Sequence, residues 1–341
     1  MAVRFPTPLK PGDLVGVTAP SSGVPDDLRA RLDAAVKAVE ARGYRVVVGE
    51  CMDGSGHVSA PAAQRAAELT VMLTDPTIRA VVPPWGGETA IDLLPLLDWA
   101  AIGSAEPTWL VGFSDISTII TPLTLLTGHA TVHGNNLMDT PYRTPPGLLS
   151  WLDIVAAAPG ATLTQTPPGR HRAAGHDDYQ TNPEVDTFTL DQAGSWTVLT
   201  GGDVAVEGRL IGGCIETLCN VAGTPYGNVA AFARNHAPEG LLVYLEACCD
   251  DAFAICRNLH GMRLAGFFTA ANAVLVGRTR APAADSLTQH EAVMDALGGL
   301  GVPIIADVEC GHVPPYLPIV NGAHGRLVYG GGSASLTQTL A

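Results

Sequence analysis

Positive charge is scarce in this chain, which has 19 lysine and arginine residues against 33 aspartate and glutamate residues and a net charge of −14. Nucleic acids and anionic membranes attract basic proteins, so we expect neither to be a partner. Long apolar runs are also missing. None approaches the ~20 residues that span a bilayer, and the opening Met-Ala-Val-Arg-Phe-Pro-Thr-Pro lacks the apolar core of a signal peptide. The composition therefore predicts a compact, soluble protein.

Paired cysteines are absent as well. The seven cysteines form no CxxC motif, and adjacent cysteines such as Cys248 and Cys249 rarely bridge each other. Free thiols are typical of a reducing compartment, so we expect a cytoplasmic protein. No HExxH or similar ligand pattern occurs, so we expect no metal and no other cofactor.

The first third of the chain alternates strand and helix patterns. Strands are predicted at 14–20, 44–48, 78–82 and 109–111, and helices at 26–42, 60–74, 89–98 and 116–126. This alternation favours a parallel sheet with helices on its faces, whose ligands lie beyond the carboxyl ends of the strands. Three turns are expected to converge there: Ser21-Ser22, Trp85-Gly86-Gly87-Glu88 and Phe113-Ser114-Asp115.

Periodicity is lost from Pro167 to about Ser195, where Pro, Gly, His, Asp and Asn dominate. Such long irregular segments are usually functional loops or linkers, so we predict a linker that forms a wall of the active site, with a solvated linker as the alternative. Beyond it, strands are predicted at 196–199, 207–211, 240–246, 273–277 and 303–307, and helices at 215–222, 251–264 and 286–297.

The predicted fold class is therefore α/β, with two domains. An N-terminal parallel-sheet domain with a serine nucleophile elbow covers residues 1–165, and a linker and active-site loop covers 166–200. A C-terminal mixed α/β domain covers residues 201–341.

The elbow is the stretch around Ser114, where an apolar strand meets a tight turn and then a helix. This geometry lifts a serine hydroxyl from the edge of a sheet and sets it at a helix N-terminus, where free N–H groups meet negative charge. By itself the stretch favours a helix cap over a nucleophile, because Ser and Asp are preferred capping residues, and only residues further along the chain reverse that order.

Two further candidates follow strands of the second domain. Glu246 ends an apolar strand, where a carboxylate needs a partner, and His312 precedes a rigid Val-Pro-Pro turn. The order Ser, Glu, His matters because a hydroxyl nucleophile needs a base, and the base needs an acceptor that orients it. An α/β-hydrolase is disfavoured because its elbow needs a second glycine where this chain has Ile116.

Motifs distributed along the chain resemble the LD-carboxypeptidase family of serine peptidases, which includes the microcin C self-immunity proteins. The matching segments, in the family's order, are Leu9–Ser22, Arg65–Leu69, Asp75–Val81, Gly86-Gly87, Gly112–Ile116, His133-Gly134, Gly208–Gly213 with Gly223-Thr224, Leu245-Glu246 and Gly311-His312. The chain departs from the family at Cys214, at Ala247-Cys248-Cys249 and at Asn135-Asn136, near the expected pocket. These departures do not involve Ser114, Glu246 or His312, so we expect them to affect which substrate is bound rather than the catalytic chemistry.

The resemblance implies a role for each matching residue. Ser114 corresponds to the nucleophile, His312 to the general base and Glu246 to the carboxylate that orients it. The backbone N–H groups of Gly87 and Asp115 correspond to the oxyanion hole. Family members are commonly homodimers, so a homodimer is expected here as well.

Three functions remain open at this point. The first is hydrolysis of the amide that joins an aminoacyl or peptidyl group to a nucleotide-like moiety, as in microcin C. The second is removal of a terminal D-residue from a muropeptide, and the third is binding without catalysis. We favour the first, with Trp85, Gly86, Glu88 and Trp196 as substrate-binding residues and Trp196 stacking on an aromatic moiety.

Overall fold

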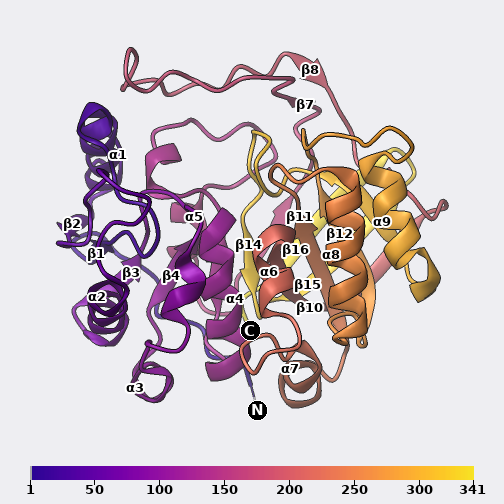
Figure 1. Cartoon of the computed structure of the whole chain (residues 1–341), viewed down its shortest axis with the longest axis horizontal. Coiled ribbons are helices and arrows are strands. Elements are labelled where there is room, and N and C mark those ends of the chain that lie inside the picture. Colours follow the sequence, from indigo (N-terminus) through magenta and orange to yellow (C-terminus); the bar gives the residue numbers. More distant parts are fainter. Residues whose placement is uncertain (1) are drawn as a thin grey trace.

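The computed structural model describes residues 2–341 and has two large sheets, each covered by helices (Figure 1), and one small two-stranded sheet. The first sheet has the order β14-β5-β4-β3-β1-β2. Its strands are β1 (Leu14–Val17), β2 (Arg45–Val48), β3 (Ile78–Val81), β4 (Trp109–Gly112), β5 (Thr131–His133) and β14 (Ile319–Asn321). The first five are parallel, and β14 is antiparallel to β5. The predicted α/β fold class is thereby confirmed.

The helices of this half are α1 (Arg29–Glu40), α2 (Ala62–Thr74), α3 (Trp99–Ser104), α4 (Ser117–Thr127) and α5 (Trp151–Val155). Strand β4 is buried along its whole length, as expected for a parallel strand covered on both faces. One predicted helix is wrong in extent. Of the range 89–98, only Ala90–Leu93 is helical, and it is a 3₁₀ turn.

The second sheet is mixed and has the order β6-β16-β15-β10-β11-β12-β13-β9. Its parallel centre consists of β10 (Val204–Cys214), β11 (Leu241–Glu246), β12 (Ala271–Gly277) and β13 (Ile304–Val308). Antiparallel strands flank this centre: β6 (Thr162–Gln165), β9 (Thr197–Val198), β15 (His324–Gly330) and β16 (Ser333–Thr339). The sequence patterns did not predict β6, β15 or β16.

Helices α6 (Ile215–Val221), α8 (Ala252–Leu264) and α9 (Gln289–Leu297) lie side by side over the near face of the second sheet, and α7 (Val229–His236) lies below them (Figure 1). Helices α6, α8 and α9 correspond to the predicted ones, whereas the sequence patterns did not predict α7. No helix within residues 2–341 has the length and hydropathy needed to cross a bilayer.

The two halves exchange strands. β14 comes from the C-terminal half but completes the first sheet, and β6 comes from the N-terminal half but joins the second. Asn321 of β14 links the sheets, since its side chain accepts hydrogen bonds from the Tyr244 hydroxyl (2.7 Å) and the Gly212 N–H (3.2 Å) and donates to Thr131 (3.1 Å). β6 and β14 therefore each pair with the sheet of the other predicted domain.

The segment that the sequence marked as a linker forms a long arm across the top of the molecule in Figure 1, with short strands β7 (Arg170–His171) and β8 (Gln192–Ala193) at its base. Arg31 of α1 holds the far end of this arm. Its buried guanidinium donates to the carbonyl oxygens of Pro183 (2.9 Å) and Val185 (2.7 Å). It also lies 4.3 Å from the centre of the Tyr179 ring.

Candidate active site

Ser114 follows the C-terminal end of β4, in a backbone conformation that non-glycine residues rarely adopt. Its φ angle is +62°, and a 3₁₀ turn of Ser114–Ile116 leads directly into α4. A left-handed conformation of this kind costs a non-glycine residue about 1–3 kcal/mol and is concentrated at functional sites. Contacts with the rest of the fold therefore hold the Ser114 backbone in a conformation that is locally unfavourable, and this backbone conformation sets the position of the hydroxyl.

The structure brings Ser114, His312 and Glu246 into one hydrogen-bonded chain. His312 Nε2 lies 2.9 Å from Ser114 Oγ, and His312 Nδ1 lies 2.7 Å from Glu246 Oε2. Glu246 ends β11 and is fully buried, whereas the His312 side chain, in the loop after β13, is 22% exposed. The serine thus comes from one half of the chain and the other two residues from the other half.

The electrostatics of the pair fit a base held beside a carboxylate. Burial alone raises the pKa of Glu246, but His312, through its charge and its hydrogen bond, and the nearby His133 outweigh this effect and hold that pKa well below its usual range. Burial likewise lowers the pKa of His312, but the Glu246 carboxylate outweighs it and raises that pKa well above the usual value. Such an imidazole can accept a proton from the Ser114 hydroxyl.

Close packing fixes the imidazole and the carboxylate. The Phe113 ring lies 4.9 Å from the His312 ring, centre to centre. At Gly311, the residue before the histidine, a methyl group would come within 2.6 Å of Glu246 Cβ. Only glycine allows the loop to approach the carboxylate this closely.

The three predicted turns do converge, and the Asp115 carboxylate joins them. Its Oδ2 accepts hydrogen bonds from the Ser21 hydroxyl (2.6 Å) and the Ala90 N–H (2.8 Å), and its Oδ1 from Thr118 (3.3 Å). A methyl group on Gly86 would lie 2.9 Å from Ser114 Cβ. The Asp115 side chain therefore ties Ser21 and Ala90, which neighbour the Gly86-Gly87 turn, to the elbow.

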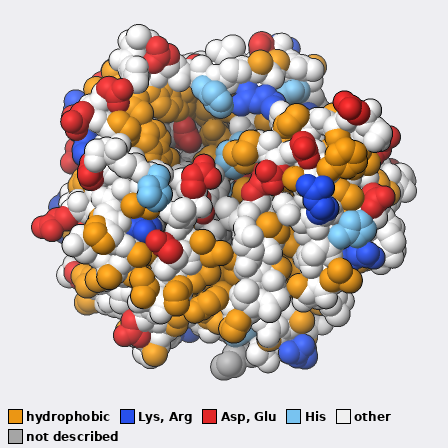
Figure 2. Space-filling view, viewed as in Figure 1, with side chains coloured by type: hydrophobic (Ala, Val, Ile, Leu, Met, Phe, Trp, Pro, Cys, Tyr) orange, Lys and Arg blue, Asp and Glu red, His pale blue; other side chains and the backbone are white. Residues whose placement is uncertain are grey.

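The molecule is hollowed near the upper rim of the face in Figure 2, where hydrophobic side chains line one side and histidine and basic side chains lie along the rim. A cavity of about 650 Å³ opens beside His312. Its aromatic wall consists of Phe113, Tyr142, Tyr179, Phe188 and Tyr316.

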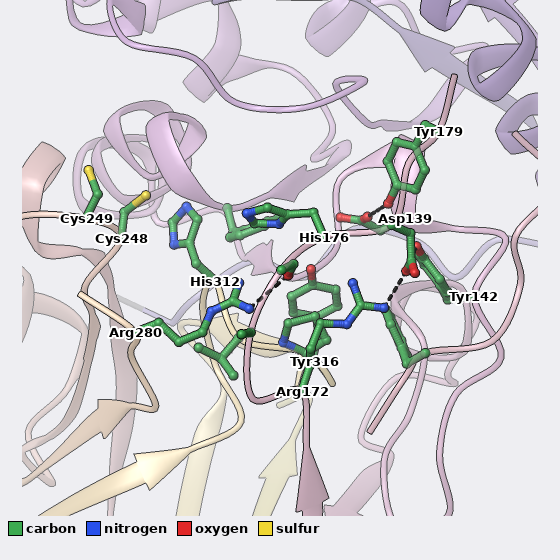
Figure 3. Close-up of a pocket in the computed structure, with 17 residues that line it drawn as sticks. Asp139, Tyr142, Arg172, His176, Tyr179, Cys248, Cys249, Arg280, His312 and Tyr316 are labelled. Atoms are coloured by element: carbon green, nitrogen blue, oxygen red, sulfur yellow. Dashed lines mark hydrogen bonds and ion pairs between the residues drawn. The ribbon is translucent and has the colours of Figure 1, made fainter. Parts of the chain in front are cut away.

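Charged side chains complete the cavity (Figure 3). Arg172 is paired with Asp177 at 2.5 Å, and the Tyr179 hydroxyl donates to Asp139 at 2.7 Å. Arg280 donates to the carbonyl oxygen of Gly175 at 2.9 Å. No carboxylate within residues 2–341 lies within ion-pair distance of Arg280. The sequence predicted the arm as a wall but none of its lining residues, because an irregular loop has no periodicity that shows which side chains point inward.

None of the predicted substrate-binding residues lines this cavity, although Gly86 lies against Ser114. Trp85 is half-buried, and its indole N–H donates to the Gly23 carbonyl oxygen at 2.9 Å, while Glu88 is exposed; neither lines the cavity, nor does Gly86. The stacking role predicted for Trp196 does not fit the structure. Trp196 is 1% exposed, and its indole N–H donates to the buried Glu309 carboxylate at 2.6 Å. Trp196 is therefore a core residue: although it lies in an irregular loop, its ring is buried and cannot face a substrate.

Potential metal ligands gather at one place within residues 2–341. Cys256 and His260 of α8 and Asp295 of α9 have ligand atoms within 4.8 Å of one another. None of the three lines the cavity beside His312.

Two stretches of the chain match known domains over most of its length. Residues 15–134 match the LD-carboxypeptidase N-terminal domain, and residues 207–327 match the LD-carboxypeptidase C-terminal domain. The chain belongs to the LD-carboxypeptidase family. The protein is accordingly a serine-type carboxypeptidase, with Ser114 in the first matched stretch and Glu246 and His312 in the second.

Individual members of the family are distant relatives. The microcin C7 self-immunity protein MccF of Escherichia coli is 23% identical over 341 aligned residues, covering 97% of this chain and 95% of that protein. The murein tetrapeptide carboxypeptidase of Pseudomonas aeruginosa is 28% identical over 246 residues, covering 72% of this chain and 69% of that protein.

Solved structures show the same fold. MccF in complex with glutamyl sulfamoyl guanosine superposes with a TM-score of 0.81 at 20% identity, covering 98% of both chains. An MccF-like protein from Bacillus anthracis gives a TM-score of 0.79 at 21% identity, again covering 98% of both chains. The LD-carboxypeptidase fold is therefore shared from end to end.

Proposed function

We propose that this LD-carboxypeptidase hydrolyses the amide bond of an aminoacyl- or peptidyl-nucleotide through an acyl-enzyme on Ser114. The observation that carries the proposal is the hydrogen-bonded chain from Ser114 through His312 to the buried Glu246. A serine hydroxyl becomes a nucleophile only when a positioned base accepts its proton, and the base works best when a carboxylate fixes its tautomer.

The reaction would proceed in two halves. His312 Nε2 takes the proton as Ser114 Oγ attacks the carbonyl carbon, and the N–H groups of Asp115 and Gly87 stabilise the oxyanion. His312 then donates this proton to the leaving amine, and the C–N bond breaks to leave the acyl-enzyme. Water, deprotonated by the same imidazole, hydrolyses the ester and releases Ser114.

The cavity supports a substrate with an aromatic and an anionic part. Tyr142 and Phe188 stack at 3.9 Å and 15°, so their wall offers flat faces on which a base can stack. Arg280 presents a guanidinium without a carboxylate partner among the described residues, which suits a phosphate or sulfamoyl group. MccF itself has been solved with glutamyl sulfamoyl guanosine and with aspartyl sulfamoyl adenosine.

The second candidate function is removal of a terminal D-residue from a muropeptide. Arg280 favours this function as well, because a carboxypeptidase must recognise a terminal carboxylate. The relative from Pseudomonas aeruginosa is a murein tetrapeptide carboxypeptidase. The two candidates differ in the leaving group, which is aromatic in the first and aliphatic in the second.

Product analysis by mass spectrometry distinguishes the two. The wild-type protein is incubated with an aminoacyl-sulfamoyl-adenosine and, separately, with a murein tetrapeptide, and Ser114→Ala is the matched control. We expect cleavage of the nucleotide substrate, a loss of about 10³-fold or more in Ser114→Ala, and no effect of a chelator. Cleavage of the tetrapeptide alone would establish the second function, and cleavage of neither would refute both.

Two further proposals concern the whole protein: a homodimer, which the resemblance to the family implies, and a cytoplasmic location, which the unpaired cysteines favour. Analytical ultracentrifugation at micromolar concentration tests the first, and cell fractionation tests the second. A monomer, or a protein recovered outside the cytoplasm, would overturn the respective proposal.

A further inference from the structure

On the side of Glu246 that faces away from His312, two buried polar atoms lie close together without a hydrogen-bond partner in the part of the chain that the structure describes. Glu246 Oε1 and His133 Nε2 lie 3.8 Å apart, and neither has a hydrogen-bond partner among the described residues. Both side chains are inaccessible, with 0% of Glu246 and 2% of His133 exposed. Buried polar atoms without partners are rare in folded proteins, so two that face each other indicate a contact.

The surroundings of His133 fix its ring in this place. His133 ends β5, next to Gly112 of the elbow strand, whereas Glu246 ends β11 of the other sheet. The Tyr244 ring lies 5.2 Å from the His133 ring at 65°, and the Phe113 ring lies 6.2 Å away at 72°. A closing movement of about 1 Å would bring the two atoms to ordinary hydrogen-bond length.

We propose that His133 is a positioning residue, which donates its Nε2–H to Glu246 Oε1 and so leaves Oε2 free to accept the Nδ1–H of His312. This inference rests on the proposed function, since it assigns His133 a task only if His312 acts as the base. His133 contacts neither substrate nor Ser114 in this role. It acts through the carboxylate.

Within residues 2–341, no other charged group forms a hydrogen bond or ion pair with Oε1. Besides the two histidines, the titratable groups facing Glu246 are the Cys214 thiol at the end of β10, the Cys310 thiol before Gly311 and the Tyr244 hydroxyl. Burial raises the pKa of each of these three groups well above its usual value, so they remain neutral. Tyr244 moreover donates its proton to Asn321.

The consequence has a definite sign. A donor on Oε1 stabilises the ionised carboxylate, and His133 is one of the two groups that lower the pKa of Glu246. Without this donor, the apparent pKa of the Glu246–His312 pair rises, whether the shared proton resides on the carboxylate or on the imidazole. Because the reaction needs the unprotonated pair, the acid limb of the rate profile moves to higher pH.

The experiment compares His133→Leu, which removes the donor, with His133→Gln, whose amide nitrogen takes nearly the place of Nε2. The probe is a fluorophosphonate, which labels an activated serine without knowledge of the natural substrate. On the acid side of the profile, we expect the pH at which the labelling rate is half-maximal to be about 1 unit higher in His133→Leu than in the wild-type protein. In His133→Gln, we expect this midpoint to stay near the wild-type value. Thermal unfolding of each variant shows whether the fold is intact.

A substrate-free readout separates this inference from the proposed function. The ring signals of His312 are titrated by NMR in protein with labelled histidine, and His312→Asn identifies them. If wild-type protein does not react with the fluorophosphonate, the proposed function fails, while the titration still tests His133. If His133→Leu leaves both the titration of His312 and the acid limb unmoved, or if His133→Gln moves them equally, the positioning role is overturned.

Discussion

Replacement of Asp115 by alanine tests whether one side chain holds both the elbow and the proposed oxyanion hole in place. The carboxylate is 3% exposed, and its Oδ2 accepts hydrogen bonds from the Ser21 hydroxyl and the Ala90 N–H. Removing a partner from a buried polar group costs about 1–3 kcal/mol, so two stranded donors cost about 2–6 kcal/mol of unfolding free energy. We therefore expect Asp115→Ala to be markedly less stable than the wild-type protein.

The same variant should lose activity, because Ser21 and Ala90, the neighbours of the Gly86-Gly87 turn, are no longer tied to the elbow. Misplacing one oxyanion donor costs about 10²–10³-fold in kcat. Asp115→Asn is the matched control, since its amide oxygen can still accept from Ser21 and Ala90 and should preserve most of both properties. The measurements are denaturant unfolding and single-turnover rates. If Asp115→Ala unfolds at the wild-type denaturant concentration and keeps its rate within about threefold, the anchoring argument is wrong.

Three further predictions follow from contacts already described. Because Glu246 raises the pKa of His312 and the reaction needs that imidazole unprotonated, kcat/KM should rise with pH to a midpoint above the ordinary histidine value of 6.5, and a midpoint at or below it would count against the assignment. Trp196→Phe removes the donor to the buried Glu309 carboxylate, so the unfolding free energy should fall by about 1–3 kcal/mol at nearly unchanged kcat/KM; a selective loss on a nucleotide substrate would restore the stacking hypothesis. Asn321→Leu strands the Tyr244 hydroxyl and the Gly212 N–H and should also cost about 2–6 kcal/mol by denaturant unfolding, whereas a loss below about 1 kcal/mol would show that the two sheets do not depend on this link.

Local patterns predicted the elements that position the site. The strands ending at Gly112 and Glu246 are short apolar runs bounded by turns, and such runs are visible without any knowledge of their neighbours. Ser114 could be singled out because strand, turn and helix follow one another within a few residues. Its proximity to His312 came from the order of motifs rather than from any local signal.

Long-range pairing and solvent exposure could not be predicted in the same way. β14 has three residues and pairs with β5, almost two hundred positions away, so nothing in Ile319–Asn321 itself marks it as part of the first sheet. Trp196 lies in an irregular loop, and its burial depends on Glu309, whose neighbours are set by the whole second sheet. Arg172 and Arg280 are ordinary surface residues by sequence, and only the folds of the arm and of the loop after β12 bring them into one cavity.

The late arrival of β14 has a consequence for biosynthesis. The ribosome completes β1 to β5 long before it reaches residue 319, so the emerging first sheet has an open edge at β5 until nearly the end of translation. Unpaired edges of this kind recruit other strands and favour aggregation. A chain that stops before Ile319 would thus retain Ser114 and yet expose the edge of β5 to pairing with other strands.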